Sequence, residues 1–560
     1  MTNTEAILAQ ADDRSRPMTA QERRVVLASS AGTIFEWYDF YLYGAMASII
    51  AKNFFSNVNP TAGYIFALLA FAAGFAVRPL GAVIFGRLGD MVGRKYTFLI
   101  TILIMGISTF LVGLLPNFHA IGLTAPVALI LLRLLQGLAL GGEYGGAAIF
   151  VGEHSPQRRR GYYTSWIQTT ASLGLLLSLI VIMAFRALIG DDDFEVYGWR
   201  FPFLMSFALL VVSVWMRLQL KETPAFRRMK AQGRGSRAPV SEAFGRWGNA
   251  KIALLALLGG TAGQAVVWYT GQFYALFFLT QILKVHNSTA NMLIAGALVL
   301  CAPFFVAFGW LSDKVGRKPV ILGGCLLAAL LYFPIFKALT AAANPALALA
   351  QATAPVTVVA DPAECSFQFN PIQSSDFVTS CDLAKNVLAS ASVNYSNVAA
   401  PAGSIARIAI GGKEIASFDG ANAPKDQLAQ KRAMFEAEVG AAVRAAGYPA
   451  AADPARINKP AVLGLLVALG LLVAMVYGPI AAQLVELFPT RIRYTSVSLP
   501  YHIGNGWFGG ILPPLAFAMV AATGNIYFGL WYPICVAMMT FVIGFALLPE
   551  TKDRNIYASD

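Results

Sequence analysis

Long runs of apolar residues, separated by short polar connections, make up most of this 560-residue sequence. A helix needs about 20 apolar residues to cross about 30 Å of hydrocarbon. Runs of this kind begin near residues 25, 61, 96, 124, 162, 200, 252, 290, 319, 460, 497 and 526. The pattern predicts an all-α membrane protein with twelve transmembrane helices.

The composition agrees, because 57% of the residues are hydrophobic and 13% are charged, whereas soluble domains carry about 25% charged residues. A disordered protein is excluded, and a soluble enzyme is not expected. The net charge of +12 comes from basic clusters in alternate connections, so it indicates topology and no nucleic-acid partner. These clusters include Arg87, Arg94, Lys95, Arg158, Arg159, Arg160, Lys314, Arg317 and Lys318. Because short cytoplasmic loops retain positive charge, we expect a multi-pass protein of the inner (plasma) membrane with both termini in the cytoplasm.

One connection motif occurs twice, six predicted spans apart. Asp90-Met-Val-Gly-Arg94-Lys follows the second run, and Asp313-Lys-Val-Gly-Arg317-Lys follows the eighth. The repeat predicts two six-helix halves related by duplication. An acid and a base at a helix junction can hold two helices together in one conformation and release them in another. We therefore predict that these four residues act in gating, the alternative being basic residues that only anchor the topology.

The second half is interrupted by a long stretch without apolar runs. Residues 404–418 alternate around a Gly-Gly pair like a hairpin, and a helical pattern follows from about Lys425 to Ala446. Cys365 and Cys381 are the only cysteines outside the apolar runs, so we predict that they form a disulfide in an exported module, the alternative being two free thiols. The expected organisation is a cytoplasmic tail at 1–24, a first half at 25–220, a connector at 221–250, spans seven to nine at 251–341, the insert at 342–459, spans ten to twelve at 460–548 and a tail at 549–560.

Several further motifs point to one family. They are Glu36-Trp-Tyr-Asp39, Arg78-Pro-Leu-Gly81, Arg133-Leu-Leu-Gln136-Gly, Gly141-Gly-Glu143-Tyr, Lys221-Glu-Thr-Pro-Ala-Phe226 and Glu486-Leu-Phe-Pro-Thr-Arg491. With the duplicated loop, they make the sequence similar to the metabolite:proton symporter branch of the major facilitator superfamily, which contains carriers for α-ketoglutarate, shikimate, citrate and proline/betaine. The resemblance covers residues 25–341 and 460–555, whereas the insert lies outside the pattern. It implies alternating access driven by protons, with Glu143, Glu486 and Arg491 among the gating residues.

Charged residues within the first two spans are expected to be functional, since an ionised group in mid-membrane is costly unless it is paired. Glu36, Asp39 and Tyr43 share one helix face. Glu36 and Arg78 both lie about 18 Å deep at 1.5 Å per residue. We predict that Glu36 pairs with Arg78 and that Asp39 carries the proton, the alternative being a static ion network.

The fourth and seventh spans carry polar residues at helical spacing. Arg133 and Gln136 lie on one stripe of span four, where the arginine fork suits a carboxylate solute; a fixed bridge to an acid of the same half is the alternative. In span seven a polar and aromatic stripe suits the wall of a solute cavity. The predicted solute-binding residues are Tyr43, Arg133, Gln136, Gln168, Gln264, Trp268, Tyr269, Gln272, His502 and Asn505.

No enzymatic or cofactor signature is found in the sequence. The Gly-Gly-Lys at 411–413 is followed by Glu414 and is not a phosphate loop, and four histidines with scattered cysteines predict no metal site. We therefore expect a monomeric, proton-coupled symporter of a small organic acid, whose partners are the solute, protons and the lipid bilayer. A symporter of a zwitterionic osmolyte such as proline or betaine and a transporter-like receptor remain the alternatives.

Overall fold

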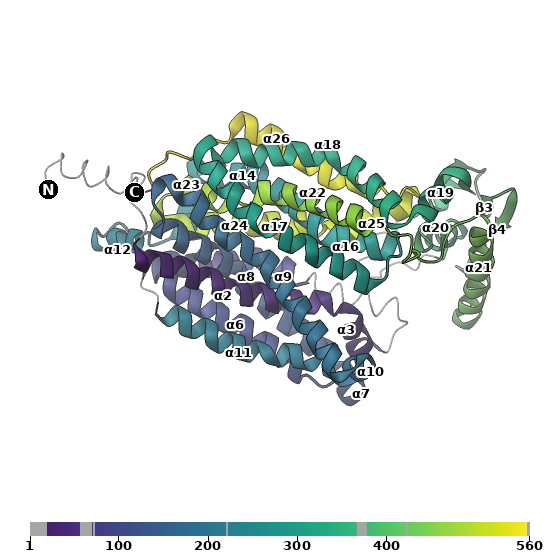
Figure 1. The fold of residues 1–560 in the computed structure, drawn as a ribbon, viewed down its shortest axis with the longest axis horizontal. Helices are drawn as coiled ribbons and strands as arrows, with labels where there is room; N and C mark the ends of the chain where they lie inside the picture. Colours follow the sequence, from purple (N-terminus) through teal and green to yellow (C-terminus); the bar gives the residue numbers. More distant parts are fainter. Residues whose placement is uncertain are drawn as a thin grey trace.

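The computed structural model describes residues 19–56, 70, 73–219, 222–366, 378–421 and 424–556. Within this part, ten helices are long and apolar enough to cross a membrane, and they run along the longest axis of the molecule (Figure 1). Their bounds are Arg94–Leu114, Thr124–His154, Gln157–Ile189, Arg200–Leu218, Trp247–Ile282, Asn287–Val315, Arg317–Ala343, Lys459–Leu487, Thr490–Val520 and Phe528–Leu547. They correspond to the predicted spans three to twelve.

The first two predicted spans are not among these ten helices. The helix α2 (Ala20–Ala45) has 26 residues and carries Glu36 and Asp39. The helix α5 (Arg78–Met91) has 14 residues, and the beginning of the predicted second span, at 61–69 and 71–72, lies outside the described residues.

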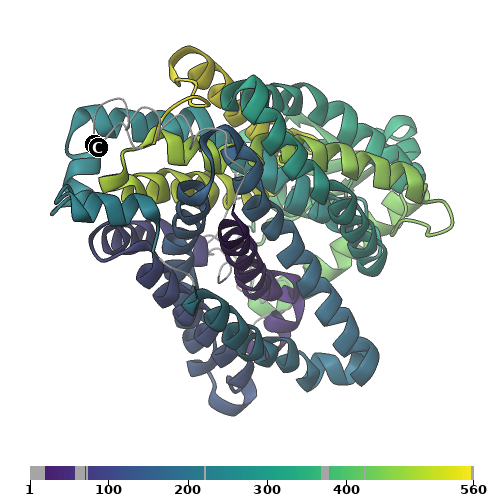
Figure 2. The ribbon, with the colours of Figure 1, turned by 60° about the vertical axis from the view of Figure 1, so that its left-hand side comes forward.

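The helices form two groups that lie side by side (Figures 1 and 2). The first group comprises α2, α5, α6 (Arg94–Leu114), α8 (Thr124–His154), α9 (Arg160–Ile189) and α11 (Arg200–Leu218). The second comprises α14 (Trp247–Ala256), α15 (Ala262–Tyr269), α16 (Ala275–Phe277), α17 (Asn287–Val315), α18 (Arg317–Ala343), α22 (Lys459–Tyr477), α23 (Ile480–Leu487), α24 (Arg493–Ile503), α25 (Leu512–Thr523) and α26 (Trp531–Leu547). Across the two groups, α5 packs on α24 and α9 packs on α17.

Two spans of the second group depart from regular α-helix. The seventh contains three π-helical segments, η3 (Leu257–Thr261), η4 (Thr270–Tyr274) and η5 (Phe278–Ile282), and the eleventh contains η8 (Gly504–Gly509). Glycines allow these segments to approach their neighbours closely: a Cβ at Gly509 would lie 2.4 Å from the Tyr269 ring. Because π-bulges often occur at functional sites, we expect these two spans to contribute residues to the functional site.

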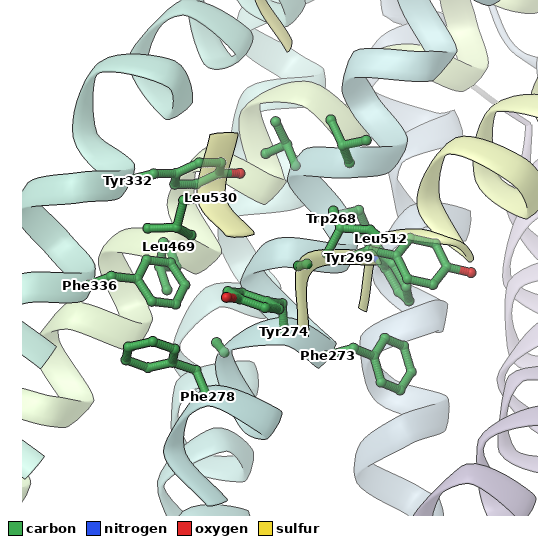
Figure 3. Packing of buried hydrophobic residues seen from close by; sticks show 14 of the residues in the cluster. Trp268, Tyr269, Phe273, Tyr274, Phe278, Tyr332, Phe336, Leu469, Leu512 and Leu530 are labelled. Carbon is green, nitrogen blue, oxygen red and sulfur yellow. The ribbon is translucent and has the colours of Figure 1, made fainter. Parts of the chain in front are cut away.

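Aromatic side chains of the seventh span point in two directions (Figure 3). Tyr274 and Phe278 pack into the core of the second group, with ring centres 5.6 and 4.9 Å from that of Phe336 in α18. Trp268 and Tyr269 lie toward the first group, where the Trp268 ring stacks on Tyr41 at 6.2 Å. The span therefore joins the core of its own group to the centre of the molecule.

A small α/β module lies between α18 and α22. Its four-stranded sheet has the order β2-β1-β3-β4. The predicted hairpin is confirmed, because β3 and β4 pair antiparallel across Gly411 and Gly412, whose φ values are +55° and +80°. The predicted helix is confirmed as α21 (Lys425–Ala445). The other elements are α19 (Pro345–Thr353), β1 (Val356–Ala360), α20 (Ser380–Ser390), β2 (Tyr395–Ala399), β3 (Arg407–Ile410) and β4 (Lys413–Ala416). A disulfide joins Cys365 to Cys381 at the start of α20.

The module is held on the ends of two helices of the second group. The Tyr395 amide donates to the Gly524 carbonyl at 2.9 Å, and Lys385 Nζ lies 3.4 Å from the Ala522 carbonyl oxygen, both at the end of α25. The Ser392 hydroxyl donates to the Gln281 carbonyl of η5 at 3.3 Å. Burial lowers the pKa of Lys385. These donors satisfy carbonyl groups that a helix C-terminus leaves without an intrahelical partner.

Candidate functional site

Arg78, the first residue of α5, lies where the two helix groups meet. Its Cζ is 4.4 Å from the centre of the Phe40 ring and 4.2 Å from that of Phe75, and the Tyr269 hydroxyl of α15 is within hydrogen-bonding reach. The side chain is 2% exposed. Among the described residues no carboxylate lies within ion-pair distance of this guanidinium.

The predicted ion pair between Glu36 and Arg78 is wrong. Glu36 pairs with Arg217 in the last turn of α11, and the Arg217 guanidinium also lies 3.5 Å from the centre of the Phe98 ring. Counting residues from the membrane surface gives the depth of a side chain but not its direction around the helix axis. Glu36 faces α11, whereas Arg78 faces the second group.

Asp39 lies one turn after Glu36 on α2 and also faces α11. Its Oδ1 accepts a hydrogen bond of 2.6 Å from the Ser206 hydroxyl. The residue is 5% exposed, and within the described part of the chain no cation lies within ion-pair distance of it. It is therefore a buried acid held by one neutral hydrogen-bond donor.

Arg133 and Gln136 lie on one stripe of α8, as predicted, but inside the first helix group. Arg133 Nη1 donates to Gln136 Oε1, and Gln136 Nε2 donates to Thr109 of α6 at 2.8 Å. The Arg133 Cζ lies 4.3 Å from the centre of the Tyr43 ring. These contacts with α2 and α6 orient Arg133 within its own half.

The predicted polar residues of the other spans contact polar side chains of neighbouring helices. Gln264 of α15 and Asn505 of η8 exchange two hydrogen bonds of 3.3 and 3.2 Å. Gln168 donates to the Tyr144 hydroxyl at 2.6 Å. Gln272 Nε2 lies 3.4 Å from the Ser172 hydroxyl of α9, a contact that crosses between the groups. The Oε1 atoms of Gln168 and Gln272 are buried and have no hydrogen-bond partner among the described residues.

His502 of α24 packs among tyrosines near the centre. Its ring meets that of Tyr501 edge to face at 5.1 Å, and Tyr501 stacks on Tyr144 of α8 at 3.4 Å. The Tyr501 and Tyr477 hydroxyls are 2.8 Å apart. The His502 side chain is buried, and neither ring nitrogen has a hydrogen-bond partner among the residues that the structure places.

A first charge network, formed by Asp90, Arg94, Glu153 and Arg493, joins the two groups at one end of the bundle. Arg493 donates to Glu153 at 2.7 Å, and Arg94 lies 3.5 Å from Asp90 and 3.9 Å from Glu153. The Asp90 carboxylate accepts the backbone N–H groups of Tyr494 and Thr495 at 3.1 and 2.9 Å. It thus binds the N-terminus of α24 in the other half, where the helix dipole favours a negative charge.

A second charge network, formed by Asp313, Arg317, Glu486 and Arg160, repeats this arrangement with the halves exchanged. Arg317 contacts Asp313 at 2.6 Å and Glu486 at 3.1 Å, and Arg160 donates to Glu486 at 2.9 Å. The Asp313 carboxylate accepts the backbone N–H groups of Gly161 and Tyr162, both at 2.8 Å. It binds the N-terminus of α9 as Asp90 binds that of α24.

Two predicted gating residues lie outside these networks. Arg491 contacts Glu242 of the connector at 2.6 Å and is 35% exposed, whereas Arg493, two residues further on, points into the bundle. Glu143 is buried on α8 and makes no ion pair among the described residues. It lies ten residues before Glu153 on the same helix, about 15 Å along the axis at 1.5 Å per residue, and so away from the end of the bundle where the two networks lie.

Four residues of these ion pairs were not predicted to be functional from the sequence: Arg217, Glu153, Arg493 and Arg160. For Arg217 a signal exists, since Ser206, Ser213 and Arg217 form a polar stripe on an otherwise apolar helix, and all three are buried. A repeated Glu-Thr pair marks the two networks: Thr223 donates to Glu153 at 2.6 Å, and Thr551 donates to Glu486 at 2.8 Å. Thr223 lies in the connector at 221–250, which was expected only to link the two halves.

Buried ion pairs that join two groups of long apolar helices are typical of multi-pass transporters with mobile halves. Comparisons with known proteins identify the protein family. The family model described as sugar (and other) transporter matches residues 25–249 and 439–560, and the model described as MFS/sugar transport protein matches residues 146–361. The chain belongs to the sugar (and other) transporter family of the major facilitator superfamily. It is therefore a multi-pass membrane transporter and not an enzyme.

Relatives and a solved structure agree with this assignment. The chain is 37% identical to the shikimate transporter of Escherichia coli (strain K12), over 58% of this chain and 74% of that protein. It is 35% identical to the proline/betaine transporter of Salmonella typhimurium, over 56% of this chain and 64% of that protein. The proton:xylose symporter XylE from E. coli has the same fold, with a TM-score of 0.63 and 15% identity over 96% of this chain and 98% of that one.

One relative bears on the insert. The chain is 30% identical to a putative metabolite transport protein of Haemophilus influenzae over 539 residues, which cover 95% of both chains. That alignment extends on both sides of the α/β module, whereas neither family model matches residues 362–438. Most of the module therefore lies outside both family models, and the expectation that it lies outside the family pattern stays a prediction.

Proposed function

We propose that this protein is a twelve-span symporter that uses the entry of protons to accumulate a small carboxylate solute by alternating access. In this proposal α2 forms the first span and α5 forms the end of the second span that leads to Asp90. Both termini lie in the cytoplasm, and the α/β module lies outside the inner membrane. The basic loops support this orientation, and a disulfide in the module is consistent with an oxidising side.

The observation that carries the proposal is the buried positive charge of Arg78 at the meeting point of the two halves. A buried charge without a partner is costly, and no carboxylate of the described residues offsets it. An anionic group of a solute would offset it. This supports a solute that carries a carboxylate.

Coupling to protons is proposed for Asp39. The residue is buried and its carboxylate is held by Ser206 alone, while Glu36 is fixed by Arg217. An acid in this setting can exist in both protonation states at moderate cost, whereas an ion-paired one cannot. Glu36 then keeps Arg217 in place while Asp39 takes up and releases the proton.

Alternating access is proposed to use the two charge networks. They join the halves at the end that carries the duplicated loops, so this end is closed in the structure. Because the two networks are equivalent with the halves exchanged, they support the duplication read from the sequence. Their separation would open this end toward the cytoplasm.

A zwitterionic solute is the second candidate, favoured by the similarity to a proline/betaine transporter. Its carboxylate fits the same arginine, and its cationic group fits the aromatic rings of Trp268 and Tyr41. Uptake by purified protein in liposomes, with the interior alkaline, decides between the two. Shikimate, α-ketoglutarate, proline and glycine betaine form the test panel. We expect one member to accumulate above its external concentration; accumulation of none would contradict the proposal.

A further inference from the structure

Among the buried arginines of the described chain, Arg78 stands apart in its contacts. Each of five others lies within ion-pair distance of an acid. These five are Arg94, Arg160, Arg217, Arg317 and Arg493. Arg133 donates to Gln136 of its own helix. Arg78 contacts two aromatic rings and a tyrosine hydroxyl instead.

The two nitrogens of one edge of the Arg78 guanidinium, Nε and Nη2, are buried and have no hydrogen-bond partner among the described residues. These two N–H groups form the side-on fork that binds a carboxylate with two parallel hydrogen bonds. Leaving buried donors without acceptors is unfavourable, because they lose the hydrogen bonds that water would give them. Because no acid or amide side chain of the described residues contacts Arg78, this edge is open to an acceptor that the described chain does not supply.

The surroundings fix the direction of this fork. The rings of Phe40 and Phe75 lie 4.4 and 4.2 Å from the Cζ of Arg78, and their own centres are 5.1 Å apart in an edge-to-face pair. Contact with ring faces is favourable for a guanidinium and restricts its rotation. The Phe75 ring in turn packs at 5.8 Å against Tyr269 of the second half. The fork is oriented before any solute arrives, which lowers the entropy cost of binding.

The second half also presents a polar group near Arg78. His502 lies on α24, which packs on α5, and both of its ring nitrogens lack a partner among the placed residues. A solute held on Arg78 therefore lies between α5 of one half and α15 and α24 of the other. Its binding would draw on both halves, as a carrier that closes around its solute requires.

We propose that Arg78 binds the carboxylate of the transported solute through Nε and Nη2, with His502 contacting a second polar group of the same solute. Arg78 was predicted from the sequence to act in proton coupling, and this assignment replaces that role. It also places the solute carboxylate on span two instead of on Arg133 of span four. It rests on the proposed function only in requiring a carboxylate, so it applies equally to an organic acid and to a zwitterion.

Binding measured without transport tests the assignment. The full-length protein in detergent is titrated with the four panel solutes, and with the primary amide of the one that binds, while its thermal unfolding is followed. Three variants are compared: Arg78→Lys, which keeps the charge but loses the fork; Arg133→Lys; and Arg87→Lys, an exposed arginine of the same helix. We expect Arg78→Lys to weaken binding at least tenfold, the other two to bind within about threefold of wild type, and the amide to bind at least tenfold more weakly than the carboxylate.

The outcomes separate this inference from the proposed function. Wild-type affinity in Arg78→Lys, or a tenfold loss in Arg133→Lys alone, would overturn the assignment while leaving carboxylate transport intact. Binding of no panel member by the wild type would contradict the proposed function and the inference with it. If Arg78→Lys unfolds without ligand, Phe75→Leu serves in its place: it keeps the arginine but removes one ring that orients it, and unchanged affinity in that variant would count against the assignment.

Discussion

Replacing Glu486 by Gln should open the end of the bundle that the two charge networks close. Glu486 accepts hydrogen bonds from Arg160 of the first half at 2.9 Å, from Arg317 of the second at 3.1 Å and from Thr551 at 2.8 Å. Its carboxylate is fully buried. The variant keeps the shape of the side chain but removes the negative charge that both arginines share.

The size of the effect depends on the contacts that Arg160 and Arg317 keep in the Glu486→Gln variant. Removing one partner of a buried ion pair costs about 3–5 kcal/mol. Arg317 retains Asp313 at 2.6 Å, whereas Arg160 retains only the Gly152 carbonyl at 3.1 Å, so the lower figure of about 3 kcal/mol applies. Since 1.4 kcal/mol is a factor of ten, the population closed at this end should fall by about two orders of magnitude relative to the open one.

Distances between spin labels measure this shift. Arg159 and Val315 are exposed at this end on opposite halves, and Cys535 is the only exposed free cysteine in the described chain, so labels are placed at the first two positions in a Cys535→Ser background. We expect a longer distance to dominate in Glu486→Gln. The control, Glu195→Gln, removes an exposed pair with Lys52 worth under about 1 kcal/mol and should match wild type. Identical distance distributions in Glu486→Gln and wild type would refute the reasoning.

Two further variants test other parts of the account. Asp39→Asn cannot alternate between protonation states, so it should lose accumulation driven by a pH gradient while still exchanging internal for external solute; pH-driven accumulation at the wild-type level would remove Asp39 from the mechanism. In the α/β module the disulfide spans 16 residues, and closing a loop of this size restrains the unfolded chain by roughly 3 kcal/mol. The paired change of Cys365 and Cys381 to Ser should therefore make the module sensitive to proteases before the helices are. Mass spectrometry that finds both cysteines alkylated without prior reduction would show that no such bond exists.

Periodicity and turn residues were sufficient to predict the ten long helices of the described chain and the hairpin and helix of the module. These features depend on local sequence: a run of 20 apolar residues or a Gly-Gly turn has few structural solutions. The duplicated Asp-x-x-Gly-Arg motif likewise predicted that Asp90 and Asp313 lie at helix junctions. Gly93 and Gly316 confirm why glycine is needed there, with φ values of +145° and +114°.

The partners of the buried charges could not be predicted in the same way. Depth along a span places Glu36 and Arg78 at one level, but the rotation of each helix sends Glu36 to Arg217 and Arg78 to Phe40. Rotation is decided by packing between helices far apart in the sequence. The networks of Glu153 and Glu486 depend on contacts across some 170 to 340 positions, which a single sequence does not reveal.

Following the external pH during uptake shows whether solute and protons enter together. Liposomes that contain the purified protein are suspended in weak buffer without an imposed gradient, and the panel solute that accumulates is then added outside. Symport predicts that the medium becomes more alkaline as solute enters, that a protonophore abolishes the change, and that Asp39→Asn shows none. Solute entry at the wild-type rate with no change in external pH, or with acidification, would contradict the account.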